Sequence, residues 1–190
     1  KRLLCHGSRI NSDSGQKVRI NELESNYERG PLLATLWLEA CSARNFKEFE
    51  GRFSKLLRDY YVYVQQQAES RLDNSAIVDL LPSNLVVIVD QNQYRAIDQE
   101  WIYKEPFSVD FILFRALLWF GYHNRCSLAR YGRTTSWKTV RDFVEYSFAK
   151  LSISLAPKIN EFVALEDHFH AEIAVSGLSF STWGLLEATL

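Results

Sequence analysis

The chain has 190 residues, 47% of them hydrophobic and 14% aromatic, which is enough for one well-buried core and somewhat few for two. Its 22 basic and 23 acidic side chains give a formal net charge of −1, so no global electrostatic field would recruit nucleic acid or an acidic membrane. Any anion-binding site must therefore be local, and a single domain over residues 1–190 is expected.

The amino-terminal residues alternate loosely between apolar and polar side chains. Residues 3–5 and 18–23 flank a polar turn at residues 11–15, a pattern typical of a short β-hairpin. The sequence begins at Lys1 and contains no methionine. We therefore expect a fragment of a larger multidomain protein, in which residues 1–30 are a remnant β region.

A helical lobe is predicted over residues 31–190. Pro31 suits the first turn of a helix that continues to Ala43. After Asn45, a good helix cap, apolar side chains recur at three- and four-residue steps and predict a long helix over residues 45–66. The apolar stripe consists of Phe46, Phe49, Phe53, Leu56, Leu57, Tyr60 and Val64.

A central β-hairpin is predicted over residues 84–98. An apolar run at 84–89 is followed by a polar turn at 90–93 and a returning strand at 94–98. Further helices are predicted over residues 109–120, 137–151 and 159–175. Together these elements predict an α+β fold that is mainly helical.

The most apolar run, residues 107–122, contains Asp110 and Arg115 and is too short to cross a bilayer. It is expected to be a core helix, and no transmembrane segment is expected. The three cysteines are odd in number and include no Cys-x-x-Cys pair, which argues against a disulfide framework and for a reducing compartment. A cytoplasmic location is therefore expected.

Asp79 and Asn84 lie immediately before the predicted hairpin, and Asp98 lies at its returning end. Because a hairpin returns the chain on itself, Asn84 and Asp98 can lie close together. In kinase catalysis an Asp orients the acceptor hydroxyl, while an Asn of the same loop and an Asp after the next hairpin hold Mg²⁺. In the alternative interpretation, Asp79 and Asn84 merely cap and shape a tight loop.

This stretch resembles the carboxy-terminal lobe of kinase-like phosphotransferases, especially the aminoglycoside- and choline-kinase-like group. In that group an Asp-x-x-x-x-Asn loop precedes an Ile-Asp-x-Glu segment, matched here by Asp79, Asn84 and residues 97–100. The resemblance implies a protein-kinase-like carboxy-terminal lobe with Asp79 as the catalytic base. It also implies Asn84 and Asp98 as Mg²⁺ ligands, with ATP as the phosphoryl donor. Glu100 would support these two ligands without itself binding the metal.

The match to the kinase pattern is incomplete. Ile77 and Val78 stand where His and Arg often precede the loop Asp. Residues 99–100 are Gln-Glu, where protein kinases have Phe-Gly. The sequence contains no Gly-x-Gly-x-x-Gly loop, and the residues before Pro31 are too few for a complete nucleotide-covering lobe. Whether catalysis survives is therefore open.

The same stretch also looks like a region that follows the methyltransferase domain of bacterial cell-surface polysaccharide proteins. The similar segments are residues 79–87, 97–101 and 114–117, within about residues 1–120. This resemblance implies polysaccharide biosynthesis, a saccharide or lipid-linked saccharide acceptor, and a neighbouring transferase domain. No strand with a Gly-rich turn for S-adenosylmethionine is readable, so methyl transfer would belong to another domain of the intact protein.

Three functional hypotheses follow from these patterns. The first is a kinase-like phosphotransferase module that transfers a phosphoryl group from Mg-ATP to an acceptor hydroxyl. The second is a non-catalytic accessory domain that positions a neighbouring methyltransferase or glycosyltransferase, and the missing phosphate-binding loop favours it. The third is a purely structural helical domain with an incidental Asp/Asn loop.

Two other patterns point less strongly to a site. The run of residues 123–141 is basic and without acids, so it can meet phosphate or an acidic saccharide, although a solvated loop with a helix start is the stronger expectation. His123 with Cys126, and His168 with His170, lack a second ligand pair, so zinc is not expected.

Overall fold

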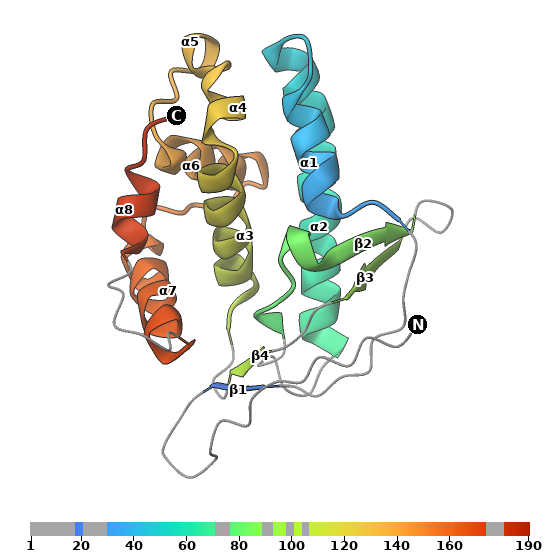
Figure 1. Ribbon diagram of the computed structural model, residues 1–190, viewed down its shortest axis with the longest axis vertical. Helices are drawn as coiled ribbons and strands as arrows, with labels where there is room; N and C mark the ends of the chain where they lie inside the picture. Colours follow the sequence, from blue (N-terminus) through green and yellow to red (C-terminus); the bar gives the residue numbers. More distant parts are fainter. Residues whose placement is uncertain are drawn as a thin grey trace.

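The computed structural model describes residues 18–20, 30–70, 77–88, 93–97, 101–103, 107–173 and 181–190 (Figure 1). The helices in these ranges are α1 (Leu33–Cys41), α2 (Phe46–Ser70), the 3₁₀ turn η2 (Pro82–Asn84), α3 (Val109–His123), α4 (Arg125–Ala129), α5 (Gly132–Thr135), α6 (Val140–Lys150), α7 (Ile159–Ile173) and α8 (Thr182–Leu186). The strands are β1 (Val18–Ile20), β2 (Leu85–Ile88), β3 (Gln93–Ala96) and β4 (Trp101–Tyr103). The described part of the chain is thus mainly helical with small antiparallel β pairs, and the α+β prediction is confirmed.

The long helix α2 forms where the apolar stripe predicted it. Its start is capped by Asn45, whose Oδ1 accepts a hydrogen bond from the Glu48 amide at 3.0 Å. The stripe buries Phe49, Phe53, Leu57, Tyr60 and Val64 in the core. Helix α1 packs against α2, and the two lie side by side in Figure 1.

Helix α3 is the central helix of the lobe, which explains why residues 107–122 are so apolar. It contacts α2, α6, α7 and α8, so nearly every side of the helix is covered. Its first turn is capped by Ser108, whose hydroxyl oxygen accepts from the Phe111 amide at 3.1 Å. In the part of the chain that the structure describes, no helix combines the length and the apolar character needed to cross a membrane.

The antiparallel pairing predicted for the central hairpin is confirmed over the described residues, because β2 pairs antiparallel with β3. The segment before α1 runs along β2 as well: Leu32 forms a bridge with Val86, and the Val87 amide donates to the Pro31 carbonyl at 2.9 Å. Gly30 permits this close approach, since a Cβ there would lie 2.3 Å from the Val87 carbonyl oxygen. The hairpin is therefore tied to the start of the helical lobe.

The predicted amino-terminal hairpin lies mostly outside the described residues. Strand β1, residues 18–20, pairs antiparallel with β4, residues 101–103. The expected partner strand at residues 3–5 is not among the described residues, so that hairpin stays a prediction.

Short helices replace the solvated loop expected within residues 123–141. Helices α4 and α5 are too short to produce a recognisable apolar period, so the sequence pattern did not indicate them. Tyr131 holds them to the core, because its hydroxyl donates to the carbonyls of Cys41 at 2.9 Å and Ala43 at 3.2 Å. Helix α8 near the carboxy terminus is likewise too short for the sequence pattern to indicate it.

Helix α6 begins with a capping box, which makes its start chemically testable. The Thr139 hydroxyl accepts from the Asp142 amide, and the Asp142 carboxylate accepts from the Thr139 amide at 2.9 Å and from the Lys138 amide at 2.7 Å. Burial opposes ionisation of Asp142, but these hydrogen bonds outweigh it and hold its pKa below the usual value.

Replacing Asp142 by Asn is expected to lower the free energy of unfolding by about 0.5–1 kcal/mol at pH 7, because a negative charge at a helix amino terminus is lost. A pKa depressed in the folded state gives stability that is present above the unfolded value, ordinarily 3.8, and is lost as the pH falls through the folded pKa. Thermal unfolding should therefore show the two proteins converging below about pH 4. A difference that stays constant down to pH 2 would contradict this assignment.

Candidate functional site

The Asp79–Asn84 loop is closed by hydrogen bonds of its backbone and of its side chains. The Leu80 amide donates to the Ile77 carbonyl at 3.0 Å, which turns the chain at Asp79. The Asn84 Nδ2 group donates to the Asp79 backbone carbonyl at 3.1 Å, and the Ser83 hydroxyl donates to Asn84 Oδ1 at 3.1 Å. The structure thus brings Asp79 and Asn84 together, and Asn84 does shape the loop as the alternative interpretation expected.

The orientation of the Asn84 amide also matters for chemistry. Because its nitrogen faces the Asp79 carbonyl, its oxygen faces the other way. Among the described residues, this oxygen accepts a hydrogen bond only from the Ser83 hydroxyl. An amide oxygen accepts through two lone pairs, so Oδ1 retains capacity for a hard cation. Shaping the loop and binding a metal are therefore compatible roles for this side chain.

The hairpin returns the chain to Asn84, as the sequence predicted. The Ile97 amide donates to the Asn84 carbonyl at 3.0 Å, so the residue just before Asp98 in the sequence contacts the entry of β2. Asp98 and Glu100 themselves lie outside the described residues. The convergence of Asp79, Asn84 and Asp98 on one site therefore stays a prediction.

Two buried side chains hold the backbone on either side of Asp79. From α3, Arg115 Nη1 donates to the Val78 carbonyl at 2.7 Å. From α2, the Tyr60 hydroxyl donates to the Leu80 carbonyl at 2.8 Å. The carbonyls immediately before and after Asp79 are thus both fixed by the helical core.

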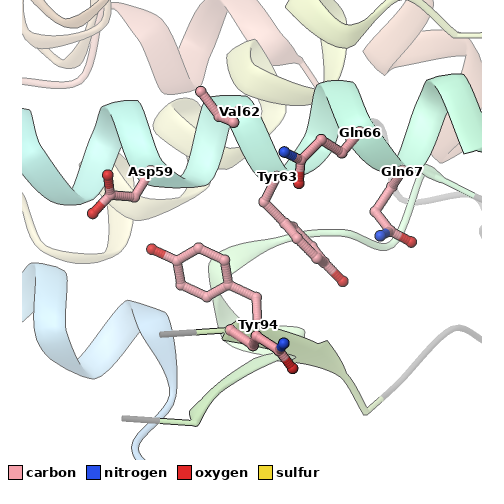
Figure 2. Close-up of a pocket in the computed structure, with 7 residues that line it drawn as sticks. Asp59, Val62, Tyr63, Gln66, Gln67 and Tyr94 are labelled. Atoms are coloured by element: carbon pink, nitrogen blue, oxygen red, sulfur yellow. The ribbon is translucent and has the colours of Figure 1, made fainter. Parts of the chain in front are cut away.

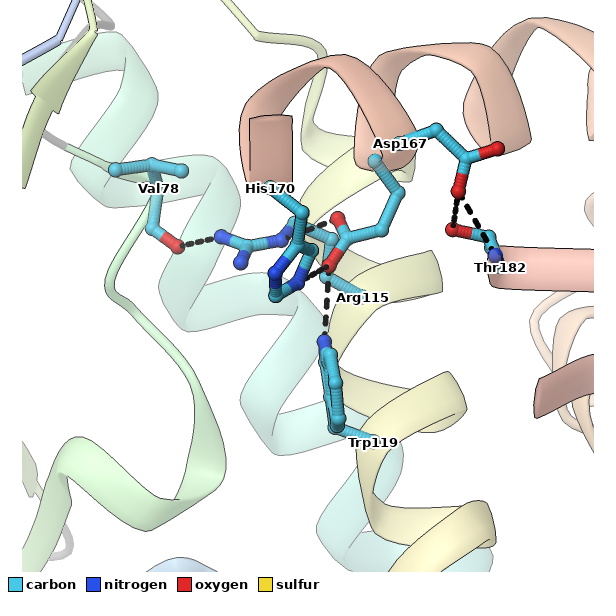
Figure 3. A network of polar contacts seen from close by, with 7 residues as sticks. Val78, Arg115, Trp119, Asp167, His170 and Thr182 are labelled. Atoms are coloured by element: carbon cyan, nitrogen blue, oxygen red, sulfur yellow. Dashed lines mark hydrogen bonds and ion pairs between the residues drawn. The ribbon is translucent and has the colours of Figure 1, made fainter. Parts of the chain in front are cut away.

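Arg115 is part of a buried ion-pair network between α3 and α7 (Figure 3). Its Nε donates to Glu166 Oε2 at 2.6 Å, and the two side chains are only 4% and 0% exposed. The Arg115 guanidinium also lies 4.4 Å from the centre of the Phe169 ring. Glu166 Oε1 accepts from Trp119 Nε1 at 2.9 Å and lies 3.2 Å from His170 Nε2.

The charge of Glu166 is maintained by this network. Burial opposes its ionisation, but the Arg115 charge and the hydrogen bonds from His170 and Trp119 outweigh burial and hold the pKa of Glu166 below its usual range. Burial raises the pKa of Tyr60, so its hydroxyl stays protonated and can donate to the loop. Tyr60 is therefore in the protonation state that its hydrogen bond to the loop requires, and Glu166 keeps the charge that pairs with Arg115.

Sequence reasoning did not assign a site role to Tyr60, Arg115 or Glu166. Tyr60 was one residue of an apolar stripe, and its hydroxyl gave no separate signal. Arg115 did give a signal, since an arginine inside an apolar core helix must find a buried partner. Nothing in the sequence pattern indicated that the partner is Glu166, 51 residues away.

Access to Asp79 is limited in the described structure. Its exposed fraction is 6%, and it lines neither the hollow between α2 and β3 nor the hollow around Phe46 and Tyr131. Within these residues, no group of three or more His, Cys, Asp or Glu side chains is placed to hold a metal ion. A Mg²⁺ site at Asn84 would therefore need Asp98 or oxygen atoms of the nucleotide.

The two histidines of α7 contact different carboxylates. His168 Nε2 lies 3.8 Å from Glu172 Oε1, whereas His170 faces Glu166. Both contacts join residues four apart on one helix.

Scans against protein-family models, curated proteins and solved structures returned no match. The function must therefore be inferred from the chain's own residues.

Proposed function

We propose that this chain is a kinase-like phosphotransferase module that transfers a phosphoryl group from Mg-ATP to an acceptor hydroxyl. The observation that supports it best is the fixed backbone around Asp79, whose neighbouring carbonyls bind Arg115 and Tyr60. A catalytic base must be held in place if it is to meet a hydroxyl in a reactive geometry. A surface loop that served only as a connection would not need two buried anchors.

Each residue has a distinct role in this proposal. Asp79 orients the acceptor hydroxyl and receives its proton as the oxygen bonds to the γ-phosphorus of ATP and the bond from that phosphorus to the leaving ADP breaks. Asn84 and Asp98 would hold Mg²⁺, which would supply positive charge beside the phosphates, and Glu100 would support these two ligands. Arg115 and Tyr60 keep the loop backbone in one conformation without touching the substrate.

The acceptor and the setting are proposed from resemblance alone. A saccharide or lipid-linked saccharide acceptor, a neighbouring transferase domain and a cytoplasmic bacterial polysaccharide pathway all belong to this proposal. An S-adenosylmethionine-dependent methyltransferase activity, if the intact protein has one, would lie in another domain.

The second candidate function is a non-catalytic accessory domain that retains the scaffold. The 6% exposure of Asp79 favours this accessory function, because a catalytic base must be accessible to the acceptor hydroxyl. In this alternative the anchored loop only stabilises the fold, and a neighbouring methyltransferase or glycosyltransferase performs the reaction.

Mg-ATP binding by the intact protein separates the two candidates. At about a hundred times its dissociation constant, Mg-ATP should add roughly 2.7 kcal/mol of stability, seen as a rise in melting temperature of roughly 5–10 °C. Replacing Asp98 by Asn should remove most of the rise, because the charge that holds the metal is lost. Glu69 is exposed on α2, so Glu69→Gln is a matched acid-to-amide control that should change little. If the rise is absent, or is unchanged in Asp98→Asn, the accessory function survives instead.

A further inference from the structure

A groove of about 500 Å³ lies between the second half of α2 and strand β3 (Figure 2). Its described lining residues are Asp59, Val62, Tyr63, Gln66, Gln67, Gln93 and Tyr94. The groove is separate from the Asp79–Asn84 loop, and its volume is within the range of small-molecule sites.

Two tyrosines form the aromatic part of the groove. Tyr63 extends from α2 and Tyr94 from β3, and their ring centres are 5.2 Å apart with the planes inclined at 64°. Both side chains are half-buried, so each ring has a fixed orientation and some exposed area. Burial, and then the nearby Asp59 carboxylate, raise the pKa of Tyr94 to about 12, so its hydroxyl stays a hydrogen-bond donor at neutral pH.

Three glutamine amides form the polar part. Among the described residues, no side-chain hydrogen bond occupies the amides of Gln66, Gln67 or Gln93. Each amide offers two donor hydrogens and an acceptor oxygen. This part of the groove can therefore satisfy ligand groups that both donate and accept, as hydroxyl groups do.

The charge of the groove argues against an anionic ligand. Its described lining contains no Lys or Arg, and its one carboxylate, Asp59, is paired with Lys55 on the same helix at 2.7 Å. A phosphate or uronate would find no Lys or Arg on the described lining to bind it, and Lys55, the cation nearest in sequence to Asp59, is already used by the Asp59 carboxylate. A neutral ligand rich in hydroxyl groups needs no such cation.

We propose that this groove binds a neutral oligosaccharide. The apolar C–H face of a sugar ring would pack on Tyr63 or Tyr94, and its hydroxyls would pair with the glutamine amides and with Asp59. Saccharide binding in the groove is proposed independently of any reaction. Only the further role of the saccharide as the phosphoryl acceptor rests on the proposed function. Tyr94 is three residues from Ile97, about 10 Å along an extended strand, so a chain of a few sugars held in the groove could extend to the Asn84 end of the hairpin.

Saturation-transfer NMR on the intact protein tests this site without nucleotide or Mg²⁺. The probes are neutral pentasaccharides of glucose, mannose, galactose and N-acetylglucosamine, with a pentamer of galacturonate and a neutral pentapeptide as comparisons. At least one neutral saccharide should bind more tightly than both comparisons. Tyr94→Ala should weaken that binding about tenfold, because a stacked ring is lost.

Gln66→Ala and Gln67→Ala test the site even if Tyr94→Ala does not fold, since they change side chains that carry no core packing. Each of the two should weaken binding about threefold. Tyr122→Ala, on α3 and outside the groove, is the matched tyrosine control and should leave binding unchanged. The proposal is overturned if no neutral saccharide binds, if the acidic saccharide or the peptide binds better, or if the glutamine variants bind as the unchanged protein does. This NMR test uses no nucleotide, so its outcome is independent of the Mg-ATP melting shift. Saccharide binding combined with no Mg-ATP effect would contradict the proposed reaction and still support this binding site.

Discussion

Replacing Glu166 by Gln is expected to lower the free energy of unfolding by about 3–5 kcal/mol, because it leaves the buried charge of Arg115 without a partner. Gln preserves the volume of the side chain, but its amide has one acceptor oxygen where Glu166 uses two, so the NH2 group must face a donor, either Arg115 or Trp119. The lost charge and this lost hydrogen bond both lower the stability. Urea-induced unfolding at pH 7 measures the effect as a shift of the midpoint.

An exposed pair on α6 supplies the control. Arg141 Nε lies 2.8 Å from Glu145 Oε1, but these side chains are 39% and 42% exposed. Glu145→Gln should therefore cost less than about 1 kcal/mol. Equal effects of Glu166→Gln and Glu145→Gln would show that the buried network does not hold the fold.

A double replacement separates the stability of the network from its effect on the loop. Arg115→Met with Glu166→Leu removes both charges and keeps apolar volume, which in comparable buried pairs is neutral or stabilising. The Val78 carbonyl then loses the donor that holds it. We therefore expect a protein whose stability is largely recovered and whose phosphoryl transfer stays impaired.

Replacing Asp79 by Asn is expected to lower the rate of phosphoryl transfer from Mg-ATP, to water or to a hydroxyl acceptor, by about 10²–10⁴-fold. Asn is nearly the same shape as Asp but cannot receive the proton of the attacking hydroxyl. Mg-ATP affinity should change only a few-fold, since Asp79 acts on the acceptor and the metal is assigned to Asn84 and Asp98. Release of ADP in the intact protein measures the rate. An unchanged rate would exclude Asp79 as the base.

The elements that depend on local patterns could be predicted from the sequence. The apolar stripe indicated α2, and the turn between two apolar strands indicated the hairpin. The prediction for α2 ended at residue 66, whereas the helix continues to Ser70, because its last turn is polar and carries no apolar period. Short helices such as α4 and α5 depend on tertiary contacts and were missed for that reason.

The candidate site could be predicted only in part. The spacing of Asp79 and Asn84 indicated one loop, and their hydrogen bond confirms that the two residues meet. The anchors of that loop could not be paired from sequence, because Arg115 and Tyr60 reach it from helices that the chain order separates widely. The groove between α2 and β3 is of the same kind, since Tyr63 and Tyr94 meet only when the hairpin packs on α2.

We propose that Mg-ATP binds at the Asp79–Asn84 loop, with Asp98 as a further metal ligand. Replacing Mg²⁺ by the paramagnetic Mn²⁺ tests it most directly, because bound Mn²⁺ broadens the amide NMR signals of nearby residues. In the intact protein with ATP, the signals of residues 79–85 and 97–100 should broaden first, while those of α5 and α8 stay sharp. Broadening that begins elsewhere, or that is unchanged in Asp98→Asn, would contradict a metal-nucleotide site in this loop.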